Sequence, residues 1–187
     1  GKLKPVANAR HIGILLPASA AAAQAILALL LRGRVVVPLN HTLPKEALRG
    51  AIQASEVRQI ITSHRFQQSL SAAGVDITAL LQGYDIFYIE DLAPGVAAWR
   101  KLCTGICLGL LPAAWCYRLW GDRVSPDEPA AILLNHDNDR APGAVLLSHR
   151  NVMANCKQMS DVMNTRRDDV IASCVPLYHP LGLTLTT

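Results

Sequence analysis

The sequence predicts an α/β fold with a doubly wound, mostly parallel sheet flanked by helices. Short aliphatic runs alternate with longer helical segments between residues 11 and 90, which is the order of repeated strand–helix–strand units. Apolar residues make up 51% of the 187 residues and aromatic residues only 5%, so Ala, Leu, Val and Ile supply the core. Because such units connect parallel strands, the crossovers are expected to be right-handed.

The first strand and helix lie near the N-terminus. Residues 11–17 form an apolar run closed by a proline, and residues 20–31 form an Ala-rich helix with Ser19 as its N-cap. The β-branched run at residues 34–40 is long enough for a fully buried strand.

The alternation continues beyond Pro44, where a helix begins. One face of this helix is apolar at helical spacing: Ala47, Leu48, Ala51 and Ile52. A strand at residues 57–62, a helix at 63–73 and a strand at 85–90 complete a β-α-β-α-β-α-β order.

The strand pattern resumes after Pro126. Residues 130–134 and 144–147 are short apolar strands joined by a polar loop at residues 135–143, which predicts a hairpin or a loop folded over a site. A further strand is expected at residues 170–175.

A helix follows the second of these strands, and Ser148 or His149 opens it. We interpret both residues as structural. Its apolar residues recur on one face, which predicts packing against the core: Val152, Cys156, Met159 and Met163.

A segment without charge begins at Leu102 and ends at Tyr117 (residues 102–117). It is too short to span a bilayer, which needs about 20 apolar residues, and Pro112 would break or kink it as a helix. Basic residues flank it and three tryptophans lie nearby. Two interpretations are open: a hairpin in a membrane interface, or a helix buried against the sheet or a neighbouring domain.

Charge and cysteine content exclude other classes of protein. The net charge of +4 is spread along the chain without a Lys/Arg run and with few aromatics, so no nucleic-acid partner is expected. Five cysteines without a C-x-x-C pair indicate reduced thiols and a cytoplasmic setting. Cys103 and Cys107 share a helix face, but no matching second pair is present, and no metal site is expected.

Two runs in the C-terminal third carry a family resemblance: VLLSHRNVMAN at residues 145–155 and VPLYHPLGL at residues 175–183. In this order and spacing they resemble the AMP-binding, adenylate-forming synthetase superfamily. They are most similar to the synthetase part of the bacterial acyl-acyl-carrier-protein synthetases/2-acylglycerophosphoethanolamine acyltransferases. The runs HIGILLP at residues 11–17 and VPLN at residues 37–40 are similar to the N-terminal subdomain of such enzymes.

This resemblance implies the N-terminal portion of an AMP-binding domain, with residues 1–125 as an N-terminal subdomain and residues 126–187 as the start of the phosphate-loop subdomain. It implies a ligase that uses ATP and Mg²⁺ to activate a fatty acid as acyl-AMP. Acyl carrier protein or CoA would then accept the acyl group, for phospholipid metabolism. The expected location is the cytoplasm or the inner face of the membrane.

The resemblance places a phosphate loop at residues 135–143, where the family has Thr, Ser and Gly followed by Lys. This sequence departs from that pattern, because Gly143 occupies the Lys position and acidic side chains enter the loop. A carboxylate about 4 Å from a phosphate costs roughly 1 kcal/mol in water and about 4 kcal/mol at an intermediate dielectric. Either the loop covers ATP with altered contacts, or it is degenerate and binds no nucleotide. Its expected residues are Asn135, His136, Asp137, Asn138, Asp139, Arg140, Pro142 and Gly143.

The resemblance also places Tyr178 and His179 beside the acyl and adenylate pocket, with Tyr178 in its wall and His179 orienting the carboxylate or gating the channel. On the residues alone, a single His on a proline-bounded loop is as consistent with a surface position. No catalytic residue is assigned, and no Ser-His-Asp triad is supported.

The family's Gly-Tyr-Gly-x-Thr-Glu segment and its C-terminal Lys domain do not occur in these residues, so this chain alone is expected to be inactive. The alternative function is a non-catalytic domain that binds acyl chains, a membrane surface or a partner domain.

Overall fold

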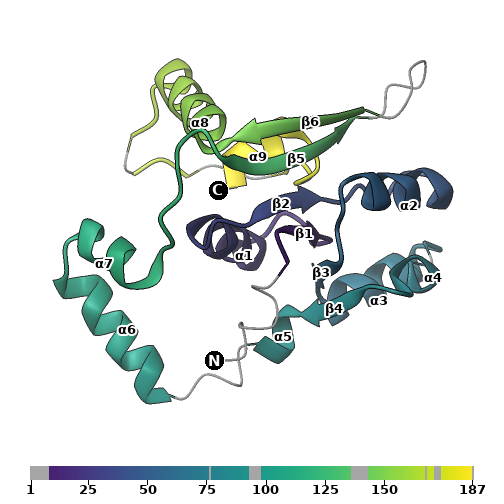
Figure 1. Ribbon diagram of the computed structural model, residues 1–187, viewed down its shortest axis with the longest axis horizontal. Helices are drawn as coiled ribbons and strands as arrows, with labels where there is room; N and C mark the ends of the chain where they lie inside the picture. The colour runs from purple at the N-terminus through teal and green to yellow at the C-terminus, as the bar shows by residue number, and fades with distance from the viewer. Residues whose placement is uncertain are drawn as a thin grey trace.

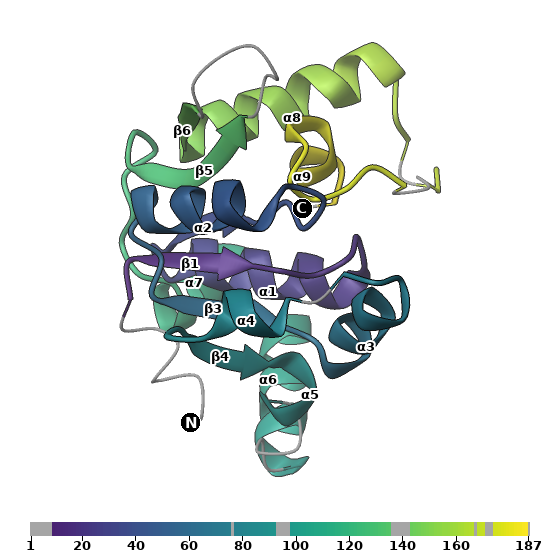
Figure 2. The same ribbon diagram turned by 90° about the vertical axis from the view of Figure 1, so that its right-hand side faces the viewer.

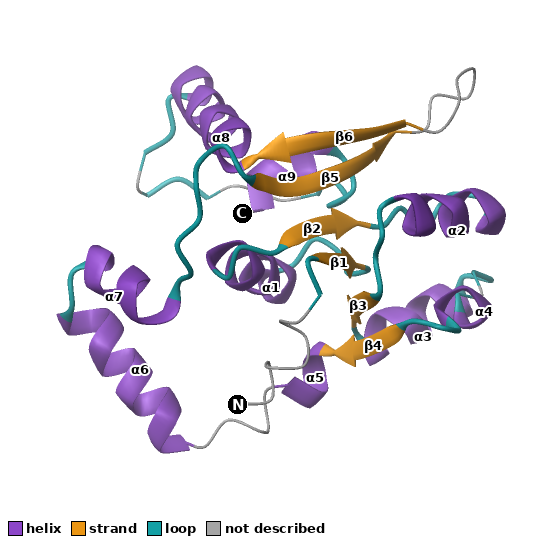
Figure 3. Ribbon diagram, viewed as in Figure 1, coloured by secondary structure: helices purple, strands orange, loops and turns teal. Residues whose placement is uncertain are grey.

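The computed structural model describes residues 9–75, 77–92, 98–135, 143–166, 168–170 and 174–186. Its centre is a six-stranded sheet of order β4-β3-β1-β2-β5-β6 (Figures 1 and 3). Neighbouring strands are parallel except for β5 and β6, which are antiparallel. The predicted mostly parallel sheet is therefore confirmed. The strands are β1 (His11–Ile14), β2 (Val35–Pro38), β3 (Gln59–Thr62), β4 (Asp85–Tyr88), β5 (Pro129–Asn135) and β6 (Gly143–Ser148).

Helices cover both faces of the sheet, as a doubly wound fold requires. One apolar cluster joins the sheet to α1 and α9, and a second joins the opposite face to α2, α3 and α4. The helices are α1 (Ala20–Leu31), α2 (Lys45–Ala54), α3 (His64–Ala72), α4 (Thr78–Leu81), α5 (Ile89–Leu92), α6 (Ala98–Leu110), α7 (Ala113–Trp120), α8 (His149–Met163) and α9 (Pro180–Thr186).

The first units form as the sequence predicts. Ser19 caps α1, since its side chain accepts a hydrogen bond from the Ala22 amide at 3.3 Å. Gly33 follows α1 with φ of +61°, a left-handed conformation that glycine adopts without strain, and the chain turns into β2. On α2, Leu48, Ala51 and Ile52 are buried, which confirms the predicted apolar face.

The strand expected at residues 85–90 is shorter in the structure. It ends at Tyr88, and Glu90 lies in helix α5. There its carboxylate accepts hydrogen bonds from the Ser63 hydroxyl at 2.6 Å and the His64 amide at 3.3 Å. Glu90 therefore supports the capped start of α3, a role that ends the strand early.

The strand expected at residues 170–175 is not seen at either described end. Val170 and Cys174 lie outside any strand, and Val170 is 95% exposed; residues 171–173 lie outside the described part of the chain. An apolar run predicts an extended segment, but pairing also needs a free strand edge beside it.

The face predicted on α8 is buried only at its start. Val152 is buried, Cys156 and Met159 are half-buried, and Met163 is 50% exposed. The helix crosses the β5–β6 hairpin near its N-terminus and then runs beyond the sheet (Figure 1), so helical periodicity alone overestimated the buried length.

The uncharged segment at residues 102–117 forms most of two helices, α6 and α7. Pro112 separates them and occupies the N-cap position of α7. Together they project from the sheet, away from β6 and α8 in both views (Figures 1 and 2). The described side chains of this segment are mostly exposed rather than buried against the sheet. Among the described helices, none has the length and apolar character needed to cross a bilayer.

Candidate functional site

A cavity of about 440 Å³ lies between the β5–β6 hairpin, the first turns of α8 and the segment that leads into α9. Its described lining contains no charged side chain. Six residues are apolar and the other four offer amide or hydroxyl groups, so the cavity suits an uncharged, largely apolar group. The lining residues are Leu133, Leu134, Val145, Leu147, Asn151, Val152, Asn155, Tyr178, Pro180 and Thr184.

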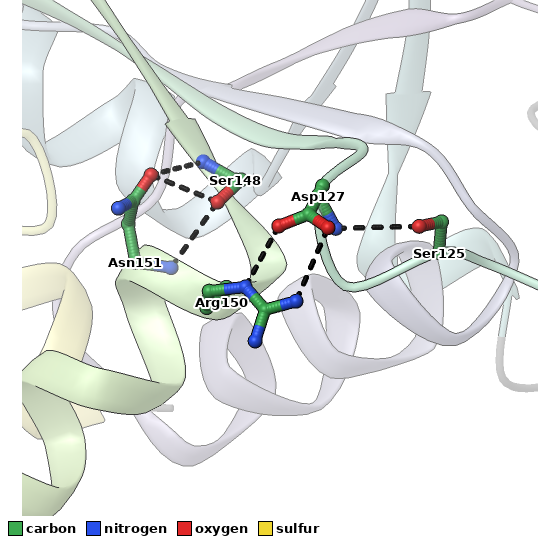
Figure 4. A network of polar contacts seen from close by, with 5 residues as sticks. All are labelled: Ser125, Asp127, Ser148, Arg150 and Asn151. Carbon is green, nitrogen blue, oxygen red and sulfur yellow. Dashed lines mark hydrogen bonds and ion pairs between the residues drawn. The ribbon is translucent and has the colours of Figure 1, made fainter.

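The start of α8 is held by a reciprocal cap. The Asn151 amide donates to the Ser148 hydroxyl oxygen at 3.2 Å, and the Ser148 amide donates to Asn151 Oδ1 at 3.0 Å (Figure 4). This is the capping-box arrangement with Asn in place of Glu or Gln. Ser148 is thus the N-cap of the two residues considered, and its partner Asn151 faces the cavity.

An ion pair fixes the same helix end to the linker before β5. Arg150 donates two hydrogen bonds to the Asp127 carboxylate, at 2.7 and 3.1 Å (Figure 4). The hydrogen bond from Arg150, followed by its charge, lowers the pKa of Asp127. The His149 and Arg150 amides also donate to carbonyls of the linker. Since both groups of the pair are well exposed, they position the chain rather than take part in chemistry.

Helices α8 and α9 meet along the floor of the cavity. Asn155 Nδ2 donates to Thr184 Oγ1 at 3.4 Å, and Cys156 Sγ lies 3.6 Å from the Thr184 carbonyl. Burial raises the pKa of the Cys156 thiol, which keeps it protonated and unreactive at neutral pH. Gly182 permits the close approach of α9, because a Cβ there would lie 2.0 Å from the Pro176 carbonyl oxygen.

The two residues predicted for the acyl pocket are placed differently. Tyr178 lines the cavity. The exposed His179 is not among the lining residues, and its Nδ1 accepts a hydrogen bond from the Leu181 amide at 3.2 Å. In this arrangement His179 stabilises the start of α9, and its role toward a substrate stays a prediction.

His41 is a neighbour of the site that the sequence analysis missed. It follows β2, and its ring makes edge contacts with Phe66 and Tyr178, at centroid distances of 5.3 and 5.9 Å. Burial lowers the pKa of His41, so the ring is neutral where it supports Tyr178. Its position after a parallel strand was the available signal, since ligand sites of such sheets lie at the carboxyl ends of strands.

The predicted phosphate loop is the connection between β5 and β6. Asn135 pairs with Gly143 at the end of the hairpin, while His136, Asp137, Asn138, Asp139, Arg140 and Pro142 lie outside the described residues. A side chain at Gly143 would meet no atom within 4 Å. Over the described ranges, no three His, Cys, Asp or Glu side chains gather as metal ligands. These residues thus offer no protein site for Mg²⁺, and we assign the metal no step.

Solved structures with the same fold show how far the likeness extends. The crystal structure of VinN superposes with a TM-score of 0.70 at 19% identity, over 99% of this chain and 45% of that one. ATP-bound MatB from Rhodopseudomonas palustris gives a TM-score of 0.69 at 19% identity, over 98% of this chain and 34% of that one. At this identity the likeness concerns the fold.

Curated relatives are ligases by name. Sulfoacetate–CoA ligase of Cupriavidus necator (strain ATCC 17699 / DSM 428 / KCTC 22496 / NCIMB 10442 / H16 / Stanier 337) is 25% identical over 183 residues, which are 96% of this chain and 32% of the relative. A protein named as a fatty-acid–CoA ligase, FadD21, from Mycobacterium tuberculosis (strain ATCC 25618 / H37Rv) is 40% identical over 67 residues, 32% of this chain and 12% of the relative. The chain thus spans about a third or less of these relatives.

The family model for AMP-binding enzymes matches residues 4–133. This match includes β1 to β4 and most of β5, so it covers well over half of the chain and most of the sheet beside the cavity. The chain therefore belongs to the family of AMP-binding enzymes.

Proposed function

We propose that this chain is the N-terminal part of an AMP-dependent acyl ligase that activates a fatty acid and transfers it to CoA or acyl carrier protein. The observation that carries the proposal is the uncharged cavity beneath the β5–β6 hairpin, whose tip is the expected phosphate loop. Family membership and the ligase names of the relatives support the same reaction class.

The proposed reaction has two steps. A fatty-acid carboxylate oxygen bonds to the α-phosphorus of ATP, and pyrophosphate leaves, which gives acyl-AMP. The thiol of the acceptor then bonds to the acyl carbon, loses its proton to solvent, and AMP leaves. Catalysis of such a reaction is largely electrostatic, since donors must stabilise charge on the phosphate as pyrophosphate departs.

The chemistry of the cavity supports a fatty acid over a short diacid. A second carboxylate would enter a space without a charged partner among its described lining residues, and an unpaired buried charge is costly. An alkyl chain instead contacts apolar side chains such as Leu133, Val152 and Pro180. Each methylene that leaves water contributes about 0.8 kcal/mol.

A peripheral membrane contact through residues 102–117 belongs to the proposal. Fatty acids partition into bilayers, so contact at the inner face of the membrane would bring the enzyme to its substrate and to phospholipid metabolism. The exposed apolar side chains of α6 and α7 support this part of the proposal.

The test is trapping of acyl-AMP as a hydroxamate by the protein expressed from the complete open reading frame. We expect hydroxamate from a fatty acid with ATP, none without ATP, and none from residues 1–187 alone. Calorimetry with ATP and with a non-hydrolysable acyl-AMP analogue accompanies it. A complete protein that binds neither ligand at millimolar concentration and forms no hydroxamate would instead be a non-catalytic domain.

A single substitution tests the loop itself. Gly143→Lys restores the family's positive charge at a position with room for a side chain. We expect ATP to bind about fivefold more tightly, because a charge pair at about 4 Å contributes roughly 1 kcal/mol in water. The matched control is Gly50→Lys, which adds the same charge at an open, exposed position of α2. Equal ATP affinity in both variants would argue against a phosphate at this loop.

A further inference from the structure

Helices α6 and α7 form an arm whose apolar side chains contact little of the remaining described structure. Cys116 Sγ lies 3.8 Å from the Cys107 carbonyl, where the two helices meet. Most of the other large apolar side chains point to solvent, and Leu110 is 79% exposed. Contiguous exposed apolar surface of this kind marks an interaction site. The exposed set includes Trp99, Leu108, Leu110, Trp115, Leu119 and Trp120.

The charge of the arm has one sign. Residues 98–121 contain Arg100, Lys101 and Arg118 and no Asp or Glu, and Arg123 follows directly. The first acidic residue after the arm, Asp122, pairs with Arg32 on α1 at 3.2 Å. Apolar and aromatic surface with an unopposed positive charge is complementary to an anionic, partly apolar surface.

A concave site of about 390 Å³ lies at the base of the arm, lined by Tyr117, Arg118, Gly121 and Arg123. The Arg118 guanidinium is 6.0 Å from the Trp115 ring centroid. Over the described ranges, neither Arg118 nor Arg123 is in an ion pair with a carboxylate. Two guanidinium groups beside exposed tryptophans fit a phosphate at the boundary between lipid and water.

The arm is fixed to the sheet domain. The Asp122 amide donates to the Leu31 carbonyl at 2.8 Å, and the Tyr117 hydroxyl donates to the Asp122 carbonyl at 2.6 Å. Leu27 and Leu31 on α1 are also exposed, and the contact at Leu31 places apolar surface next to the base of the arm. A surface bound by the arm would therefore hold the domain in one orientation, with β6 and α8 directed away from it (Figures 1 and 2).

We propose that the arm docks on an anionic phospholipid bilayer. Trp115 and Leu119 enter the interface, while Arg118 and Arg123 bind head-group phosphates. Docking is peripheral, because neither helix of the arm is long enough to cross a bilayer. This inference deepens the membrane contact of the proposed function and rests on that contact, but it does not depend on the ligase reaction.

The test is flotation of the protein from the complete open reading frame with two kinds of vesicle: phosphatidylcholine alone, and equal parts phosphatidylcholine and phosphatidylglycerol. We expect binding to the anionic vesicles that weakens as salt is added. The double variant Arg118→Gln/Arg123→Gln should bind about thirtyfold more weakly, which is about 2 kcal/mol for two basic residues at the surface. Leu119→Glu should abolish binding by placing a charge in the interface.

Matched controls make the same chemical changes elsewhere. Arg58→Gln/Arg65→Gln removes two exposed arginines near β3 and α3, and Met153→Glu replaces an exposed apolar residue of α8. Both should float like the unaltered protein, and circular dichroism should show that all variants fold. Loss of binding by the controls as well would overturn the proposal.

Other outcomes also decide against docking. No flotation of the unaltered protein would show that other residues cover the arm, and equal flotation with neutral vesicles would exclude the phosphate site. Dissociation of a dimer by Leu119→Glu without vesicles would assign the arm to contact between copies. Hydroxamate formation from a short-chain fatty acid without vesicles should be unchanged in the arm variants. A protein that floats but forms no hydroxamate would therefore overturn the ligase proposal alone.

Discussion

At Gly182, helix α9 lies against the backbone of Pro176 so closely that a Cβ would be 2.0 Å from its carbonyl oxygen. We expect Gly182→Ala to lower the free energy of unfolding by about 2 kcal/mol, because overpacking against backbone forces α9 to move. Gly50→Ala is the control, since that position in α2 is open and alanine there should stabilise the helix by about 0.5–1 kcal/mol. Denaturant unfolding of both variants measures the difference; a shift of the same sign in both would contradict the packing argument.

Individual residues were predictable where their role is local. Ser19 and Ser148 were expected as helix caps, and their hydrogen bonds confirm it. The contact of His41 with Tyr178 joins residues far apart in sequence, and no local pattern encodes such a pair. The cavity beside Tyr178 also depends on a β5–β6 hairpin and an α8–α9 contact, whose packing the sequence does not specify.

Among the elements, α8 depends on its N-terminal cap to begin where it borders the cavity. Ser148→Ala removes the oxygen that accepts from the Asn151 amide and should lower the free energy of unfolding by about 1 kcal/mol, whereas Ser148→Thr should retain most of it. Asn151→Ala removes the reciprocal bond to the Ser148 amide, so the double variant should cost less than the sum of the single ones. Thermal unfolding of the four proteins measures this coupling, and strict additivity would argue against the reciprocal cap.

Elements with a strong period and a clear cap were predicted well. Helix α1 spans the expected residues, and the strand–helix order through β4 is confirmed. The errors fall where tertiary contacts decide: Glu90 leaves the strand to support α3, Met163 extends past the sheet, and residues 170–175 show no strand at their described ends. Hydrophobic pattern identifies segments that are able to pair, while the position of their partners is a property of the whole fold.

For the whole molecule, His41 links stability to pH. It contacts α3 through Phe66 and the segment before α9 through Tyr178, and burial lowers its pKa below the ordinary value of 6.5. The folded chain thus binds fewer protons than the unfolded chain as the pH falls through 6.5, and stability is lost in that direction. His41→Gln should make the free energy of unfolding rise less steeply with pH around this value. Denaturant midpoints above and below pH 6.5 measure the slope; equal slopes would show that His41 does not contribute.

The sheet order also determines how far the chain must travel between β4 and β5. These strands are separated by β3, β1 and β2, a distance of roughly 19 Å at about 4.8 Å per strand. Residues 89–128 make this connection. Without residues 102–117 the remaining linker would still reach roughly 80 Å when extended at about 3.3 Å per residue. The connection therefore has far more length than closure of the sheet demands, and the arm is a segment that can be shortened, exchanged or lengthened while the strand order stays the same.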